Sequence, residues 1–374
     1  ALPFRAYHFI YNEWFRDQNL IDKVDWVTTD GPDNYTGLSS IRTRAKKHDY
    51  FTSCLPYLQK GDPVTVAIGT TARVAYDGAE QSEIGIWSTD ESDERAMDAN
   101  LSRLTLSTIA SIPSALMYAD LTQATGVSIN ALRQSVAIQR LLEKDARGGT
   151  RYTELIKAHF GVTSPDYRLQ RPEYLGGGKS WINITAVANT SGTATEDQGE
   201  LRGIGTGTIN GHGWAKSFTE HGYILGLICA RGDLTYFQGI DKLWSRSTRY
   251  DFYLPVLANL GEQSVLNKEI YVSGDANDDL VFGYQERWAE YRMKRSLITG
   301  KFDPNATGAL SHWHLAEDFA SLPSLNQTFI QDATPMARVT TVDTEPDFVL
   351  DVWFDYKCAR PMPVFSVPSL TGRF

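Results

Sequence analysis

The sequence contains little cysteine, little histidine and no long apolar run. Its cysteines, Cys54, Cys229 and Cys358, lie far apart and form neither a CxxC pair nor a Cys/His pattern. A disulfide framework and a structural zinc site are therefore not expected, and a reducing compartment is the simplest interpretation. No apolar stretch reaches about 18 residues, so we expect no membrane span. We also expect no signal peptide.

Basic charge is in deficit as well, with 36 Lys and Arg against 45 Asp and Glu and a formal net charge of −9. Such an acidic chain is a poor candidate for wrapping nucleic acid with its whole surface, although a local basic patch stays open. Hydrophobic residues make up 42% and aromatic residues 11% of the chain, which is typical of a globular protein. The 30 glycines and 15 prolines favour β structure with many turns.

Helical spacing of apolar residues occurs at three places. The spacing over 4–15 predicts an opening helix that ends near Leu20. Ser128 is a good N-cap for a second helix over 129–148, which ends at a pair of glycines. A third helix is expected over 150–160.

Strand-like runs occur at 181–188, 223–229 and 348–358, separated by long, aromatic-rich loops. The run 348–358 alternates strictly, with Phe348, Leu350 and Val352 on one side and Val349 and Trp353 on the other. This alternation predicts a strand with one buried face. Loops this extensive need something to pack against, and a neighbouring subunit is the surface that we expect.

The stretch 62–125 differs from the rest, because it holds ten acidic and only three basic residues. It also contains strand-like runs at 64–68 and 84–87. We interpret it as an insertion with short strands of its own that stands in solvent.

Two short motifs imitate ligand sites. Gly176-Gly177-Gly178-Lys179-Ser180 resembles the end of a phosphate loop, but Glu173 stands where that loop needs a glycine, so a structural turn is favoured. His312 and His314, with Asp318 four residues beyond the second, imitate a metal site. No third strong ligand is evident, and local packing and hydrogen bonding are favoured. We predict no metal site and no cofactor.

Two kinds of carbohydrate-directed protein stay open as interpretations of this sequence, namely a hydrolase and a binding module. Glu286 and Glu290 could pair as acid and base, but their spacing favours a solvated helix face with Arg287 and Lys294. A β-rich polysaccharide hydrolase and a jelly-roll glycan-binding module are the alternatives to a structural protein. The hydrolase requires a carboxylate pair about 5–10 Å apart, and we predict no catalytic residue.

The stretch 42–48 is the one nucleic-acid candidate, although a solvated loop is its default interpretation. If nucleic acid contacts the chain here, the candidate residues are Arg42, Arg44, Lys46 and Lys47.

Long motifs rich in Trp, Tyr, Cys and His occur at 2–7 with 12–20, 48–56, 140–143 with 145–152, 171–177, 217–223, 282–287 and 357–364. These motifs resemble the major capsid protein of Microviridae, specifically of the Gokushovirinae. The resemblance runs from end to end and breaks mainly at 62–125.

The resemblance implies a mainly β fold, a single eight-stranded viral jelly roll (a β-sandwich or barrel) with long insertion loops that contain a few helices. It implies that 1–374 form one capsid domain and that about 60 copies close a T=1 icosahedral shell around circular single-stranded DNA. Family members carry an N-terminal stretch ahead of residue 1, so we expect the chain to be N-terminally incomplete. The ending 368–374 also departs from the family's Asp-His-Phe end.

The family further implies that 62–125 is a variable protrusion at the threefold axes that meets the host. Implied partners are further copies of the chain, the phage's internal scaffolding, DNA-binding and pilot proteins, and a host surface receptor, without membrane insertion. Implied locations are the virion and, during assembly, the bacterial cytoplasm. The candidate host-contact residues are Tyr76, Glu83, Trp87, Asp90, Glu91, Asp93 and Glu94.

Overall fold

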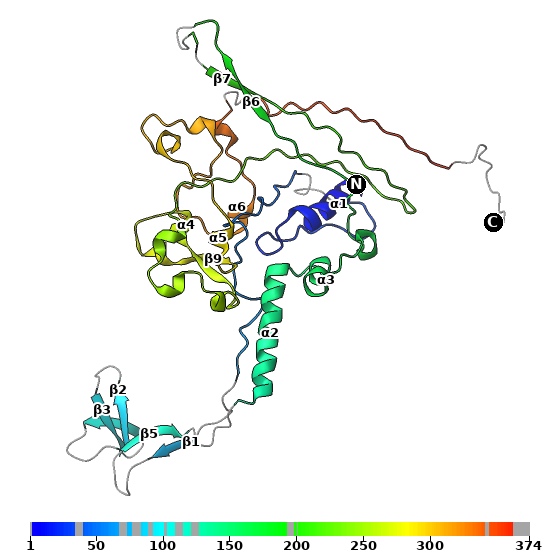
Figure 1. The fold of residues 1–374 in the computed structure, drawn as a ribbon. Helices are drawn as coiled ribbons and strands as arrows, with labels where there is room; N and C mark the ends of the chain where they lie inside the picture. Colours follow the sequence, from blue (N-terminus) through cyan, green and yellow to red (C-terminus); the bar gives the residue numbers. More distant parts are fainter. Residues whose placement is uncertain are drawn as a thin grey trace, which may run out of the picture.

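The computed structural model describes residues 2–33, 40–66, 127–192, 198–199, 201–340 and 344–361, together with five strands between residues 73 and 120. Figure 1 shows a body of loops and short elements, from which the long helix α2 leads away. No helix in these ranges is long and apolar enough to cross a membrane.

The chain opens with α1 (Leu2–Ile10), which continues as a π-helical turn, Tyr11–Phe15. The carboxylate of Asp17 then accepts hydrogen bonds from the backbone N–H groups of Asn19 and Leu20, at 2.8 and 2.9 Å. A side chain that holds nearby amides in this way competes with helical hydrogen bonds. The predicted opening helix is thus confirmed, but it ends before Leu20.

Helices α2 (Ile129–Gly148) and α3 (Tyr152–Phe160) confirm the two predicted helices. The Ser128 Oγ accepts a hydrogen bond from the Ala131 N–H at 3.1 Å, which caps α2. Gly161 takes φ 69° after α3, a left-handed conformation that glycine adopts without steric cost. A 2.6 Å contact between His159 Nε2 and Asp145 Oδ1 joins the two helices.

The remaining helices are short. The α-helices are α4 (Asn267–Ile270), α5 (Ala289–Arg292) and α6 (Gln327–Ile330). The 3₁₀ segments are Asp166–Leu169, Lys242–Ser245, Arg249–Asp251, Pro255–Leu257, Ala276–Asp279, Gly300–Phe302, Ser311–Trp313 and Met336–Arg338. Most lie within long connections between the other elements.

Five strands between residues 73 and 120 form one sheet in the order β1-β5-β2-β3-β4. Neighbours are antiparallel except for β2 and β5, which are parallel. Figure 1 shows this sheet beyond the far end of α2. The strand predicted at 84–87 is confirmed by β2, whereas 64–66 form no strand and 67–68 lie outside the described residues. The strand bounds are β1 Arg73–Tyr76, β2 Ile84–Ser88, β3 Asp93–Asn100, β4 Arg103–Thr108 and β5 Ala115–Asp120.

Two antiparallel pairs of strands complete the described sheets. β6 (Asn183–Ala188) pairs with β7 (Leu201–Thr206), which confirms the strand predicted at 181–188. β8 (Gln263–Leu266) pairs with β9 (Val281–Gln285) in the middle of the body. The β6 side chains are all exposed, whereas β8 and β9 contribute to the core.

The core is one cluster of buried residues around β8 and β9, which we call the central cluster. Phe51, with 0% exposure, lies at its centre, and its ring packs edge-to-face on Tyr236 at 4.9 Å between centroids. The Gln285 side chain, also fully buried, donates to the Tyr50 carbonyl at 2.9 Å. The cluster consists of Tyr50, Phe51, Cys54, Tyr236, Val265, Ile270, Phe282, Ala289 and Phe329.

The runs 223–229 and 348–358 differ from prediction, because neither belongs to a strand ladder in the described residues. The predicted buried face of 348–358 is not present: Phe348 and Leu350 are exposed, and so are Val349 and Trp353 on the other side. An isolated extended segment has no partner for its backbone groups and no second layer to cover a face. The eight-stranded jelly roll stays a prediction.

Candidate functional site

The dominant surface feature of this chain is apolar area left open to solvent. The chain exposes 28115 Å². A folded monomer of this mass is expected to expose about 15,000 Å². Among the described residues, two stretches without sheet pairing, 209–229 and 348–358, carry many exposed large apolar side chains, and we call them the extended segments.

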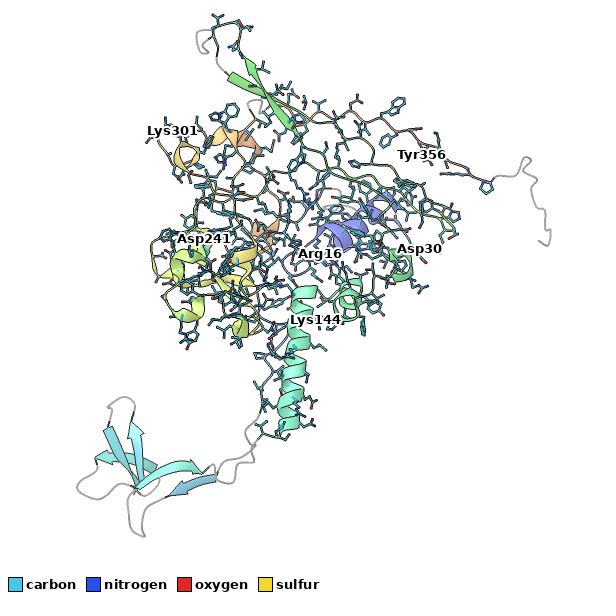
Figure 2. The ribbon with its side chains drawn as sticks, viewed as in Figure 1. Arg16, Asp30, Lys144, Asp241, Lys301 and Tyr356 are labelled. Atoms are coloured by element: carbon cyan, nitrogen blue, oxygen red, sulfur yellow. The ribbon has the colours of Figure 1, made fainter. Side chains whose placement is uncertain are left out.

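Large side chains crowd both extended segments. Trp353 is 91% exposed and Phe354 is 80% exposed, and Figure 2 shows the neighbouring Tyr356 on the arm that runs away from the body. Large apolar side chains exposed in this number are typical of a surface for association. The other exposed residues of the segments are Ile209, Trp214, Phe218, Tyr223, Ile224, Leu227, Ile228, Phe348, Val349, Leu350, Val352 and Tyr356.

A buried polar network anchors the loops around the central cluster. The Glu269 carboxylate accepts from the Tyr50 hydroxyl at 2.8 Å and from the Leu266 N–H at 3.0 Å, and it pairs with Lys242 at 3.3 Å. Burial, followed by the Glu269 charge, raises the pKa of the Tyr50 hydroxyl. The Tyr50 hydroxyl therefore stays neutral and donates its hydrogen bond. Tyr50, Lys242 and Leu266, which are far apart in sequence, all bind the carboxylate of Glu269.

A second tyrosine is held in the same way. The Tyr236 hydroxyl donates to Asp49 at 2.9 Å, and burial together with that carboxylate raises its pKa. Asp49 also accepts from the N–H groups of Phe51 and Thr52, at 2.9 and 2.8 Å. The hydrogen bonds of Tyr50 and Tyr236 thus hold together loops from distant parts of the chain.

The four nucleic-acid candidates are placed in different environments. The Lys46 side chain is only 4% exposed, pairs with Glu317 at 3.0 Å and lies over the Phe329 ring, so it points into the protein. The Arg44 guanidinium lies over Phe15, at 5.5 Å from the ring centroid. Arg42 is half-buried and Lys47 is exposed. The structure therefore does not bring the four side chains together as one basic patch.

Four of the host-contact candidates fall on described strands. Tyr76 lies in β1, Trp87 in β2, and Asp93 and Glu94 in β3, where Trp87 pairs in register with Glu94. The other three candidates lie outside the described residues, namely Glu83, Asp90 and Glu91.

The motif that imitates a phosphate loop lies in irregular backbone, and the structure assigns no turn to it. No helix follows Gly176-Gly177-Gly178-Lys179-Ser180, and the next element is the strand β6. A Cβ atom on Gly176 would lie 3.0 Å from the Gly213 carbonyl oxygen, so the glycine permits a close backbone approach.

The histidine pair is also explained by local hydrogen bonding. The His314 Nε2 lies 2.6 Å from the Phe302 carbonyl oxygen, and its Nδ1 accepts from the Ala316 N–H at 3.2 Å. Asp318 pairs with Arg338 at 3.6 Å. Across the residues that the structure describes, no group of three or more His, Cys, Asp or Glu side chains is arranged to hold a metal ion.

The interpretation of Glu286 and Glu290 as a solvated face is wrong for Glu290. Its carboxylate is almost buried and pairs with Arg246 at 3.2 Å, while Gln263 donates to it at 2.6 Å. Glu286 is exposed and pairs with Arg292. Helical spacing missed the buried role because both partners of Glu290 come from outside its own helix.

Sequence reasoning also missed a surface on which cations and aromatic rings alternate. The segment 242–253 carries Lys242, Arg246 and Arg249 together with the exposed rings of Trp244, Tyr250, Phe252 and Tyr253. The alternation of Lys or Arg with Trp, Tyr or Phe was the available signal. Arg246 lies over the Phe252 ring of this segment and over the Tyr291 ring of α5, and it is the structural centre of the surface.

Comparisons with known proteins agree with one another. Residues 1–370 match the family model described as "Capsid protein (F protein)". Capsid protein VP1 of Bdellovibrio phage phiMH2K is 46% identical over 396 residues, which cover 100% of this chain and 73% of that protein. Capsid protein VP1 of Chlamydia phage 1 is 41% identical, with 99% and 74% covered. Capsid protein VP1 of Spiroplasma virus 4 is 36% identical, with 99% and 73% covered.

Proposed function

This chain belongs to the phage F capsid protein family, and we propose that about 60 copies of it close a T=1 icosahedral shell around a circular single-stranded DNA genome. Its function is structural, as a capsid protein of the virion. The copy number, the symmetry and the enclosed genome are the proposed part.

The observation that supports self-association most directly is the exposed apolar surface of the extended segments. Trp353 and Phe354 project from the arm with almost their whole side chains in solvent. Burial of apolar area against a neighbour contributes roughly 25 cal/mol per Å², and closed symmetry repeats each contact around the shell. Rings that cost free energy in an isolated chain thereby become contacts between subunits.

We propose a jelly roll as the mature fold, with the runs 223–229 and 348–358 as two of its strands. The alternation of 348–358 and the extended backbone of both runs support this. Each run needs a neighbouring strand, and the relatives contain more chain than this sequence, since it spans 73% of the phiMH2K protein.

The insertion 62–125 is proposed to form a protrusion at the threefold axes that contributes to attachment to the host. Its acidic composition and its separate five-stranded sheet support a solvent-facing role. Tyr76, Trp87, Asp93 and Glu94 are the described residues proposed for host contact.

The proposed partners are further copies of the chain, packaged DNA, the internal scaffolding, DNA-binding and pilot proteins of the phage, and a host surface receptor. Assembly is proposed to take place in the bacterial cytoplasm. We further propose that the protein is not an enzyme and acts only by association, since the buried Glu290 is engaged by Arg246 and Gln263.

The decisive experiment is electron microscopy of the full-length protein expressed with its internal scaffolding partner. Uniform icosahedral particles with threefold protrusions are expected. A chain that remains a discrete monomer under assembly conditions, as judged by size-exclusion chromatography, would overturn the proposal. Hydrolysis of glycans by that monomer would favour the hydrolase, and glycan binding without hydrolysis would favour the binding module.

A further inference from the structure

An aromatic and cationic surface lies on one side of the body, apart from both extended segments. It is built from 241–256 and 286–295, which together hold seven Lys and Arg against four Asp and Glu in a chain of net charge −9. Figure 2 labels Asp241 at the start of this surface. We call it the cationic surface.

Exposed rings alternate with the charges along the first segment. Trp244 is 79% exposed, and Tyr250 and Tyr253 are more than half exposed. The Arg249 guanidinium lies over the Tyr250 ring, at 5.4 Å from its centroid. In the described ranges Arg249 has no ion-pair partner, so its charge remains available to a ligand.

Arg246 fixes the geometry of the surface. Its guanidinium lies 5.5 Å from the centroid of Phe252 and 4.5 Å from that of Tyr291, and it pairs with Glu290 at 3.2 Å. Both rings are about half exposed. Because Arg246 holds two half-exposed rings from different segments, these rings are positioned before any ligand arrives.

A cavity of about 550 Å³ adjoins the second segment, and its charged lining consists of Arg140, Arg287, Arg292, Glu143, Glu262 and Glu286. Glu262 in its wall pairs with Arg147 and Glu286 pairs with Arg292, whereas the Glu143 carboxylate accepts a hydrogen bond from the Gln139 amide at 2.9 Å. Arg140 and Arg287 also line it, and neither has an ion-pair partner within the described part of the chain. The cavity is of the size that accepts one nucleotide-sized group, with two guanidinium groups for an anion.

We propose that the cationic surface binds single-stranded nucleic acid, with bases stacked on its exposed rings and phosphates held by Arg140, Arg249 and Arg287. This inference rests on the proposed function, which places such a strand inside the shell, and it assigns the contact to residues outside 42–48. Stacking on aromatic side chains combined with cations along the backbone is how proteins bind single strands without sequence preference. The charges distinguish this surface from the extended segments, whose exposed residues are mainly apolar.

The test uses the full chain and a fluorescein-labelled 20-nucleotide oligo(dT), followed by fluorescence anisotropy at several salt concentrations. The double variant Trp244→Ala/Tyr250→Ala is expected to weaken binding at least tenfold, because each lost stack removes a base contact. Arg249→Ala is expected to weaken binding and to reduce the slope of log affinity against log salt concentration by about one.

The matched control is Trp353→Ala, which removes an equally exposed ring from an extended segment and is expected to leave oligo(dT) affinity unchanged. The inference is overturned if the wild-type chain does not bind oligo(dT), or if the double variant and the control bind equally. It is also overturned if the double variant binds normally but no longer assembles, since the surface would then be a contact between copies.

Particle formation is measured separately by electron microscopy. A wild-type chain that binds oligo(dT) through these residues but forms no particles would refute the proposed shell and leave this binding surface standing. If particles form normally but neither Trp244→Ala/Tyr250→Ala nor Arg249→Ala changes the oligo(dT) affinity, the binding surface is refuted and the proposed shell stands.

Discussion

The central cluster and the extended segments use the same kinds of residue in opposite ways. Phe51 in the cluster is fully buried among other rings, whereas Trp353 and Phe354 in an extended segment lie almost entirely in solvent. Buried polar side chains of the cluster, such as Tyr50 and Glu269, are hydrogen-bonded to each other within the chain. The comparison teaches that aromatic content alone does not identify a core. What counts is whether the partner of each ring lies in the same chain.

The largest expected effect is on the cluster side of this comparison. Phe51→Ala removes the central ring from contact with Tyr236 and Phe282, and the free energy of unfolding should fall by about 3–5 kcal/mol. Urea unfolding of the unassembled chain, followed by fluorescence, measures this loss. The control Trp353→Ala should change it by less than about 0.5 kcal/mol. If both substitutions lower the free energy of unfolding equally, the central cluster and the extended segment do not differ in their contribution to the stability of the isolated chain.

The next effect concerns the buried carboxylate. Glu269→Ala leaves the Tyr50 hydroxyl and the Lys242 ammonium without their acceptor, and it should cost about 2–3 kcal/mol of unfolding free energy. Glu286→Ala is the matched control, because Glu286 and Arg292 form an exposed ion pair worth less than about 1 kcal/mol. The same unfolding measurement applies, and a Glu269→Ala chain as stable as the control would contradict the network.

A third prediction separates association from stability. Trp353→Ser/Phe354→Ser should leave the unfolding free energy within about 0.5 kcal/mol of the wild type, because both rings are exposed in the isolated chain. The concentration needed for particle assembly should rise at least about tenfold, as expected when interface rings are removed. Sedimentation of assembly reactions measures that shift. If the variant assembles at the same concentration as the wild type, Trp353 and Phe354 do not contribute to the contacts between subunits.

The smallest expected effect is a pH response in an exposed loop. Hydrogen bonds from the Ser273 hydroxyl to Asp275, and from the Ser273 backbone N–H to Asp278, hold the pKa of both carboxyls below the ordinary value. The carboxylates therefore stabilise the loop fully above pH of about 4, and this stabilisation is lost as the pH falls through their lowered folded pKa values. Hydrogen exchange at the Ser273 and Gly274 amides should accelerate there relative to amides of the central cluster. If the exchange rates of both sets of amides depend on pH in the same way, the prediction is wrong.

Sequence reasoning succeeded where the signal is local. Ser128 caps α2, and Gly161 ends α3, because each interaction joins residues within one or two turns. The long motifs also indicated the correct family, which the match over residues 1–370 shows.

It failed where the partner is remote in sequence. The pairing of Lys46 with Glu317 and that of Glu290 with Arg246 have no local signature. The alternation over 348–358 predicted a buried face, but only a second strand and a covering layer can bury one, and the described residues supply neither. Arg246 was overlooked as the centre of the cationic surface because its rings, Phe252 and Tyr291, come from separate segments.

By itself, the sequence determined the presence of the opening helix, helices α2 and α3 with their ends, the strands at β2 and β6, and membership of a capsid family. The helices and their ends depend on hydrogen bonds and caps between residues that are close in sequence, so a local pattern is enough to predict them. Only the tertiary structure decided which aromatic rings form the central cluster, that Lys46 points inward and that Arg246 gathers two rings on one surface. Burial depends on contacts between distant segments, and the order of residues along the chain does not specify which of them meet.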